Sequence, residues 1–185
     1  MHNWPTGELG KVSIKPGTAM AGADFFDIYI RGFGSHAAMP QISKDPIVIA
    51  SSLVAQLQTI VSRNVPPTEP LVLSVTKIHA GAAYNVIPSE CVISGTMRYF
   101  DLEMANMVRN RMKDLTDGMA KSYGVEIDIE NQEVFDVLVN NEDLSHKMLD
   151  IASEVVGSEN VALRPNVIAG SEDFADMLKV VPGAY

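Results

Sequence analysis

The sequence predicts an α+β fold built around a ferredoxin-like unit, in which a four-stranded antiparallel sheet carries two helices on one face. Between residues 23 and 136, strand-like and helix-like apolar patterns follow one another in the order β-α-β-β-α-β. The stretches 1–22 and 137–185 are rich in turn residues and have no apolar core of their own. We therefore expect them to be two pieces of an incomplete α/β domain, the second one truncated, into which the unit at 23–136 is inserted.

Composition and charge narrow the class of protein. The 185 residues are 46% hydrophobic and 20% charged, which is ordinary for a globular domain. The net charge of -9 argues against nucleic-acid and anionic membrane partners. No apolar run approaches the roughly 20 residues of a membrane span. The single cysteine, Cys91, cannot form an intrachain disulfide, so we expect a cytoplasmic protein.

The first half of the inserted unit is expected to be a strand, a corner and a helix. Residues 25–30 are apolar and aromatic and predict a strand. The glycines of the following Gly-Phe-Gly-Ser-His corner permit unusual backbone angles, so His36 is expected on a tight, exposed turn. Asp45 and Pro46 predict a helix start. Its expected apolar face consists of Ile47, Ala50, Leu53, Val54, Leu57 and Val61.

The second half is expected to contain three strands and a long helix. Residues 71–78, 91–100 and 125–130 have the β-branched or alternating character of strands. Asp101 is expected to cap a helix that ends before Gly124. The apolar stripe of that helix is typical of core packing rather than of a cofactor site, and consists of Met104, Met107, Val108, Met112, Leu115 and Met119.

The C-terminal piece is expected to contain two helices. Residues 141–156 have helical spacing and end at a glycine. Ser171 is expected to be the N-cap of a second, shorter helix. Glu172 and Asp173 would then lie near the positive end of its dipole.

Five fragments in order carry a family resemblance. They are His2-Asn3-Trp4-Pro5 with Gly10, Gly34 to Pro40 followed by Asp45-Pro46, Gly81 to Pro88, Gly95-Thr96-Met97-Arg98, and Gly170 to Phe174. Together they resemble the co-catalytic metallo-aminoacylase and carboxypeptidase family. The branch that they resemble most cleaves N-acyl amino acids, as do hippurate hydrolase, auxin-conjugate hydrolase and N-acetyldiaminopimelate deacetylase.

The resemblance implies a metal-dependent amidohydrolase and a homodimer. In the family, a catalytic domain binds two divalent metals such as zinc, manganese, nickel or cobalt, and an inserted ferredoxin-like lid mediates dimerisation. The family's other metal-binding segments, its Glu-Glu pair and its last metal-binding histidine are absent from these 185 residues. We therefore expect a lid-containing fragment that is inactive alone and binds no metal.

Specific roles follow from the resemblance, position by position. His2 matches a metal ligand, and His36 matches the lid histidine that stabilises the oxyanion in the partner subunit's site. Asn85 matches a substrate contact, and Arg98 matches the arginine that binds the substrate carboxylate. Residues 170–171 match a loop that lines the substrate site at a helix N-terminus.

The residues alone leave other roles open. His36 and Asn85 also suit exposed turns, and Arg98 suits a surface salt bridge. His79 and His146 match no motif of the family. A different class of function is a stand-alone dimerisation or small-molecule-binding regulatory module of ferredoxin-like fold. RNA binding is disfavoured because the predicted strands lack clustered aromatic side chains.

Overall fold

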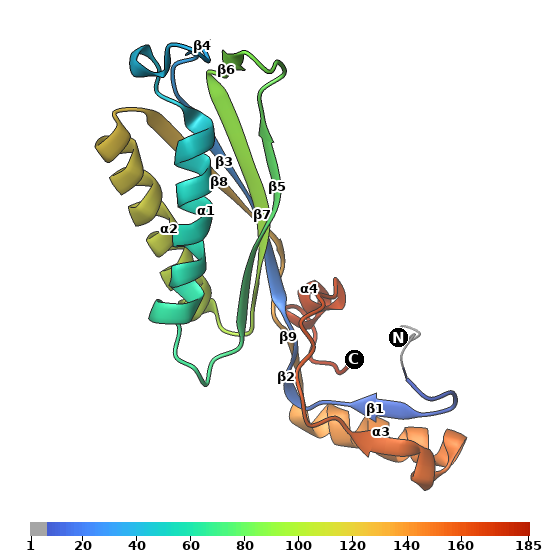
Figure 1. Ribbon diagram of the computed structural model, residues 1–185. Helices are drawn as coiled ribbons and strands as arrows, with labels where there is room; N and C mark the ends of the chain where they lie inside the picture. Colours follow the sequence, from blue (N-terminus) through green and yellow to red (C-terminus); the bar gives the residue numbers. More distant parts are fainter. Residues whose placement is uncertain (1–6) are drawn as a thin grey trace. The chain divides into compact units, whose positions relative to one another are not determined.

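Strands β3 (Gly22–Arg31), β5 (Leu71–Ala80), β7 (Glu90–Tyr99) and β8 (Glu126–Phe135) form a four-stranded sheet in the computed structural model (Figure 1). The structure describes residues 7–185. Their contacts divide the chain into a sheet unit, Asp24–Val134, and a flanking unit, Met1–Ala23 with Phe135–Tyr185.

The order of strands in the sheet is β5-β7-β3-β8. Strands β5 and β7 are antiparallel neighbours, with one irregularity between Val75 and Lys77. The first strand of the unit therefore lies inside the sheet, between the third and the last. This is the arrangement of a split β-α-β unit, and it confirms the predicted fold class.

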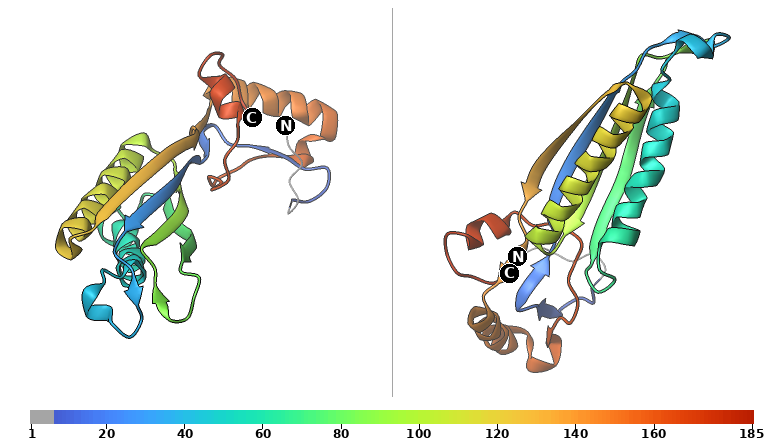
Figure 2. Two further views of the ribbon diagram at one scale, coloured as in Figure 1. Left: turned by 90° about the horizontal axis from the view of Figure 1, so that it is seen from above. Right: turned by 90° about the vertical axis from the view of Figure 1, so that its left-hand side faces the viewer.

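Helices α1 (Pro46–Asn64) and α2 (Leu102–Tyr123) lie on the same face of this sheet (Figures 1 and 2). Both start where the sequence predicts. The carboxylate of Asp45 accepts a hydrogen bond from the Ile47 amide, and that of Asp101 accepts one from the Met104 amide. Helix α2 ends at Gly124, which has a φ of 63° and so adopts the left-handed conformation of a helix C-cap.

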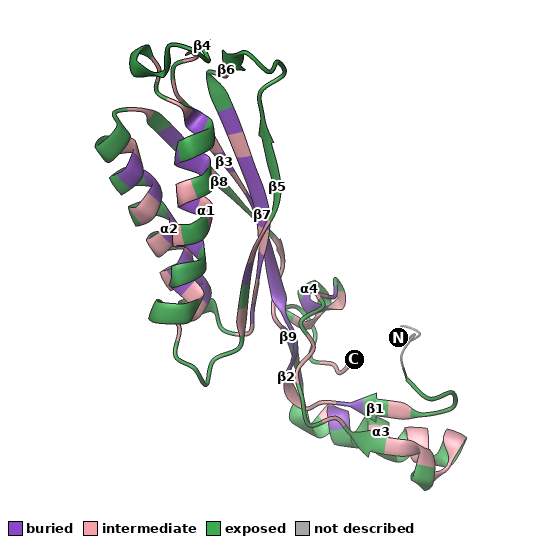
Figure 3. Ribbon diagram, viewed as in Figure 1, coloured by how far each residue is buried: buried purple, intermediate pink, exposed green. Residues whose placement is uncertain are grey.

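The core lies between the two helices and the sheet (Figure 3). The predicted apolar face of α1 is partly wrong, because Ile47 is 43% exposed. A helix turns about 100° per residue, so a buried stripe that starts at Pro46 turns the side chain of Ile47 away from the sheet. The side chains of α1 that are buried are Pro46, Ile49, Ala50, Leu53, Leu57 and Ile60. In α2 they are Ala105, Val108, Met112, Thr116 and Met119.

Three short elements form one end of the sheet unit. Strand β4 (Ser35–His36) pairs antiparallel with β6 (Val86–Ile87). A 3-10 turn, η1 (Pro40–Ile42), follows β4. We call residues 32–44 and 81–89, which contain these elements, the tip.

In the flanking unit, segments from the two ends of the chain pair with each other. Strand β1 (Val12–Ile14) is parallel to β10 (Val161–Leu163), and β2 (Gly17–Met20) is antiparallel to β9 (Leu138–Asn140). The stretch 1–22, which is rich in turn residues, therefore also contains two short strands. These pairings need the far end of the chain, so local sequence does not reveal them.

The described part of the flanking unit, residues 7–23 and 135–185, also has a small core and three helical segments. These are α3 (Glu142–Val156), the 3-10 turn η2 (Ser158–Asn160) and α4 (Phe174–Leu178). The expectation that the two pieces lack a core holds for each piece alone but not for the pair. Ala19 and Met20 of the first piece pack with Leu138 and Ala175 of the second. Within residues 7–185, no helix has the length and apolar character needed to cross a membrane.

Candidate functional site

The tip brings His36 and Asn85 together, although they are far apart in the sequence. His36 lies opposite Val86 in the β4–β6 register. The Ala37 amide donates a hydrogen bond of 2.9 Å to the carbonyl oxygen of Asn85. Both His36 and Asn85 are exposed. The pairing therefore holds the backbones of His36 and Asn85 close to each other at one end of the sheet unit.

Close backbone packing explains the glycines before His36. Neither Gly32 nor Gly34 has a positive φ, so the expected need for unusual backbone angles is wrong. A Cβ atom at Gly34 would instead lie 2.6 Å from the carbonyl oxygen of Ile87, and one at Gly32 would lie 2.1 Å from that of Lys44. The missing side chains allow the chain before β4 to approach β6 and Lys44, which lies two residues before α1. The glycines thus fix where His36 sits.

A local hydrogen bond fixes the proton on the His36 ring. The Ala38 amide donates to His36 Nδ1 at 3.1 Å. A ring nitrogen that accepts a hydrogen bond carries no proton, so the proton of the neutral imidazole lies on Nε2. The ring therefore presents a hydrogen-bond donor to solvent, which is the group needed to stabilise a developing negative charge.

Arg98 lies near the other end of the sheet. It is half-buried on β7, opposite Val72 of β5. Strand β7 begins at Glu90, just after the tip, and rises about 3.3 Å per residue, so Glu90 and Arg98 are roughly 26 Å apart. Within one chain, the structure brings His36 together with Asn85 but not with Arg98.

Gly170 and Ser171 precede α4 in the flanking unit. Helix α4 begins at Phe174 with Asp173 at its N-cap, so the expected N-cap role of Ser171 is wrong. The Gly170 carbonyl oxygen instead accepts a hydrogen bond from the Ala21 amide, which ties this loop to the end of β2. Glu172 is buried rather than solvated, and its carboxylate accepts from the Phe174 amide at 3.4 Å. Helix α4 has five residues and begins three residues after Ser171.

The described residues do not by themselves form a metal site. His2, the expected ligand, lies outside the described residues. Within 7–185, no cluster of three His, Cys, Asp or Glu side chains could hold a metal ion. His79 and His146 are both exposed.

A buried ion pair in the sheet unit was not foreseen from the sequence. Arg109 of α2 donates two hydrogen bonds to the carboxylate of Asp24, from Nε at 2.7 Å and from Nη2 at 2.9 Å. The hydrogen bond to Asp24 is also the main reason why the pKa of Arg109 is raised. The guanidinium lies 5.6 Å from the ring centre of Tyr99, whose pKa burial raises to about 12. Asp24 and Arg109 are separated by most of the sequence of the sheet unit, so no local motif or spacing predicts that they pair.

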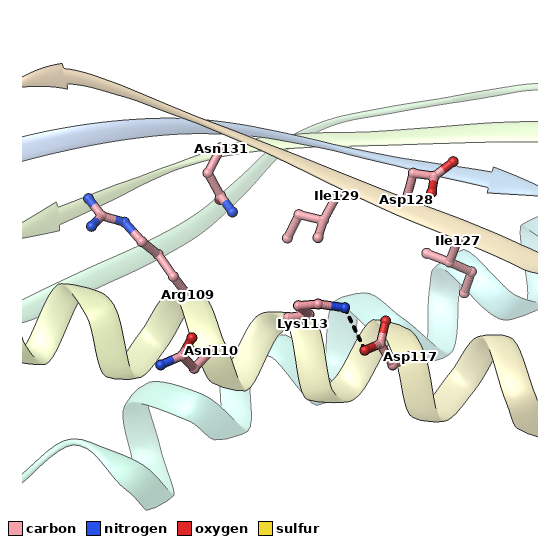
Figure 4. Close-up of a pocket in the computed structure, with 8 residues that line it drawn as sticks. All are labelled: Arg109, Asn110, Lys113, Asp117, Ile127, Asp128, Ile129 and Asn131. Carbon is pink, nitrogen blue, oxygen red and sulfur yellow. Dashed lines mark hydrogen bonds and ion pairs between the residues drawn. The ribbon is translucent and has the colours of Figure 1, made fainter.

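Arg109 also lines a cavity of about 370 Å³ between α2 and β8 (Figure 4). The cavity contains charges of both signs, including the ion pair between Lys113 and Asp117 on successive turns of α2. None of the predicted site residues lines it. A larger cavity of about 820 Å³ lies at the tip and is lined by Ser35 and Val86, which flank the candidate site residues.

A family model described as "Peptidase dimerisation domain", M20_dimer, matches residues 18–124. The chain belongs to the M20 peptidase dimerisation-domain family. This match covers the sheet unit from its start to the end of α2, and it confirms the resemblance that the five sequence fragments predicted.

Curated relatives and solved structures agree with this membership. The chain is 37% identical to N-acetyl-L-cysteine deacetylase of Bacillus subtilis, which it matches over 100% of its own length and 44% of that protein's. It is 34% identical to hippurate hydrolase of Campylobacter jejuni, over 100% of its own length and 48% of that protein's. The crystal structure of Bacillus subtilis YXEP protein, a dinuclear metal binding peptidase from the M20 family, matches with a TM-score of 0.75 and 27% identity. That match covers 99% of this chain and 45% of the other.

The chain spans about half the length of the curated relatives that it matches. The dimerisation domain is therefore present, and the matched relatives are hydrolases that are about twice as long.

Proposed function

We propose that this chain is the lid-containing part of a dimeric, metal-dependent amidohydrolase that hydrolyses the amide bond of N-acyl amino acids. In this proposal residues 23–136, which contain the sheet unit, are the lid, and residues 1–22 and 137–185 belong to the catalytic domain. Two relatives with this chemistry, a deacetylase of N-acetyl-L-cysteine and a hippurate hydrolase, support the substrate class. A buried thiol at Cys91 suits a reducing compartment such as the cytoplasm.

The observation that carries the proposal is the separation of the candidate substrate contacts. His36 and Asn85 lie at the tip, whereas Arg98 lies roughly 26 Å along β7 from the residue that follows the tip. Only a few bonds separate the scissile carbonyl of an N-acyl amino acid from its carboxylate. One substrate therefore cannot reach all three side chains of one copy, and the proposed site needs two copies.

We assign the two copies complementary roles. Arg98 of one copy binds the substrate carboxylate through its forked guanidinium. His36 of the partner subunit donates the hydrogen of Nε2 to the oxyanion that forms when water attacks the carbonyl carbon. Asn85 of the partner subunit, held beside His36, contacts the substrate. Residues 170–171 line the site from the catalytic domain.

When bound, the divalent metals of the full-length enzyme would activate the attacking water. His2 is proposed as one of their ligands, and the other ligands lie outside these 185 residues. The isolated chain is accordingly proposed to be inactive and metal-free.

The test is a His36→Ala variant of the full-length enzyme. Loss of one oxyanion donor lowers kcat by about 10²–10³ in comparable sites. We expect a fall of that size with no change in metal content measured by elemental analysis. An unchanged kcat would remove His36 from the mechanism, and would favour the alternative of a regulatory module in which the tip has no catalytic role.

A further inference from the structure

Large apolar side chains are exposed on the tip around His36. They come from the corner before His36, the turn after it and the strand opposite it, and they are Phe33, Met39, Ile42, Tyr84 and Val86. Large apolar side chains that gather on an exposed surface are candidates for contact with a ligand or a partner. Val86 is tied to His36 by the strand register and Met39 by a hydrogen bond, and Tyr84 precedes Asn85, whose carbonyl oxygen bonds to the Ala37 amide. We call Met39, Tyr84 and Val86 the collar.

The β4–β6 pairing sets the collar against the imidazole. Val86 lies directly opposite His36, and side chains at such positions are on the same face with Cβ atoms about 5 Å apart. The Met39 amide donates to the His36 carbonyl oxygen at 2.8 Å, which folds the chain back after β4. Tyr84 immediately precedes Asn85 and is fully exposed. Whatever His36 Nε2 reaches is therefore bordered by apolar side chains.

The chemistry of an N-acyl amino acid indicates which half of the substrate would lie against the collar. The scissile carbonyl carbon carries the amide nitrogen on one side and the acyl group on the other. The amino-acid half leads to the carboxylate and hence to Arg98, which belongs to the other copy in the proposed arrangement. The copy that supplies His36 would therefore contact the other half of the substrate, the acyl group.

We propose that the collar forms one wall of the acyl-group pocket, with Val86 at its centre, and selects substrates whose acyl group is apolar and longer than acetyl. This inference rests on the proposed function and adds the substrate class to it. It makes Val86 a specificity-determining residue, because the acyl carbons next to the carbonyl would pack on its methyl groups.

The test compares kcat/KM of the full-length enzyme for N-acetyl and N-hexanoyl derivatives of one amino acid. Each fully buried methylene group raises kcat/KM by about fourfold. If the hexanoyl chain packs on the collar, kcat/KM for the N-hexanoyl substrate should therefore exceed that for the N-acetyl substrate. Val86→Thr keeps the shape and replaces a methyl group by a hydroxyl, and it should lower the hexanoyl-to-acetyl ratio by about 3–10-fold. Val86→Leu should shift the preference toward shorter chains because it fills the pocket.

Val139→Thr is the matched control. Val139 is 51% exposed and Val86 is 49% exposed, and each lies in a short two-stranded pairing. Val139 belongs to the flanking unit rather than to the tip, so its variant should keep the wild-type ratio within about twofold.

Other outcomes overturn the inference in distinguishable ways. An unchanged ratio in Val86→Thr and Val86→Leu, or an equal loss on both substrates, would show that Val86 does not select the acyl group. If His36→Ala still lowers kcat in the same assay, the proposed function survives that result. If His36→Ala leaves kcat unchanged, the proposed function and this inference fall together.

Discussion

Replacing Arg109 by Met should destabilise the sheet unit more than any loss of an exposed ion pair. The carboxylate of Asp24 is 1% exposed and receives two hydrogen bonds from the guanidinium, whose own side chain is 16% exposed. Removing the cation leaves a buried carboxylate without that partner, and breaking a buried pair in this way costs about 3–5 kcal/mol. The Met side chain keeps most of the aliphatic packing, so the loss reports the charge pair.

Urea unfolding followed by circular dichroism measures this effect. The free energy of unfolding falls by about 1–3 kcal/mol per molar urea, so the urea concentration at the unfolding midpoint should be about 2 M lower for Arg109→Met than for the wild type. Lys113→Met is the matched control on the same helix, because Lys113 is 65% exposed and pairs with the exposed Asp117. That variant should lose no more than about 0.5 kcal/mol.

A second substitution separates charge from packing. Asp24→Asn in the Arg109→Met background removes the stranded charge, so the double variant should regain more than about 1 kcal/mol of the free energy of unfolding. A loss in Arg109→Met no larger than in Lys113→Met, or no recovery in the double variant, would refute the reasoning that Asp24 depends on Arg109.

Three further predictions concern the backbone, the alkaline limit and the thiol. Gly34→Ala should lower the free energy of unfolding by about 1–3 kcal/mol, because its Cβ would meet the Ile87 carbonyl oxygen. Gly118 lies in a helix with no atom within 4 Å of an added Cβ, so Gly118→Ala should raise the free energy of unfolding by about 1 kcal/mol. Thermal unfolding of the two variants measures this difference. Burial raises the pKa of Tyr99 from 10.0 to about 12, so its contribution to stability is complete below pH 10 and is lost as the pH rises to about 12. A Tyr99→Phe variant should lose stability less steeply over that range in urea titrations, and parallel curves would contradict the assignment. Burial likewise raises the pKa of the Cys91 thiol, so a thiol reagent should react with it much more slowly in the folded chain than in urea, and equal rates would contradict its burial.

The sequence predicts the sheet unit well because its signals are local. Asp45, Asp101 and Gly124 cap their helices through atoms only a few residues away. The alternating pattern of β7 predicts a strand without any knowledge of its neighbours in the sheet. The resemblance also identifies the Gly-Ser-His corner and the Asn85 turn, which the structure pairs as β4 and β6.

What the sequence does not predict depends on distant partners. The pairing of β1 with β10 and of β2 with β9 joins segments from opposite ends of the chain, so each looks like a loop when taken alone. Asp24 and Arg109 meet only after the sheet unit has folded. Gly34 suggested unusual backbone angles, but the reason for glycine there is the nearby Ile87 carbonyl oxygen. Helix α4 starts at Phe174 rather than after Ser171, and Glu172 is buried.

The most direct test of the central claim uses mixed dimers of the full-length enzyme. His36→Ala and Arg98→Ala variants, each nearly inactive alone, are unfolded, mixed in equal amounts and refolded together. If His36 serves the partner's site, each mixed dimer contains one site in which both side chains are intact. Half of the dimers are mixed and half of their sites are intact, so the activity should recover to about a quarter of the wild-type value. No recovery, with mixed dimers shown by mass spectrometry, would mean that His36 and Arg98 of one chain serve the same site, and would contradict the claim.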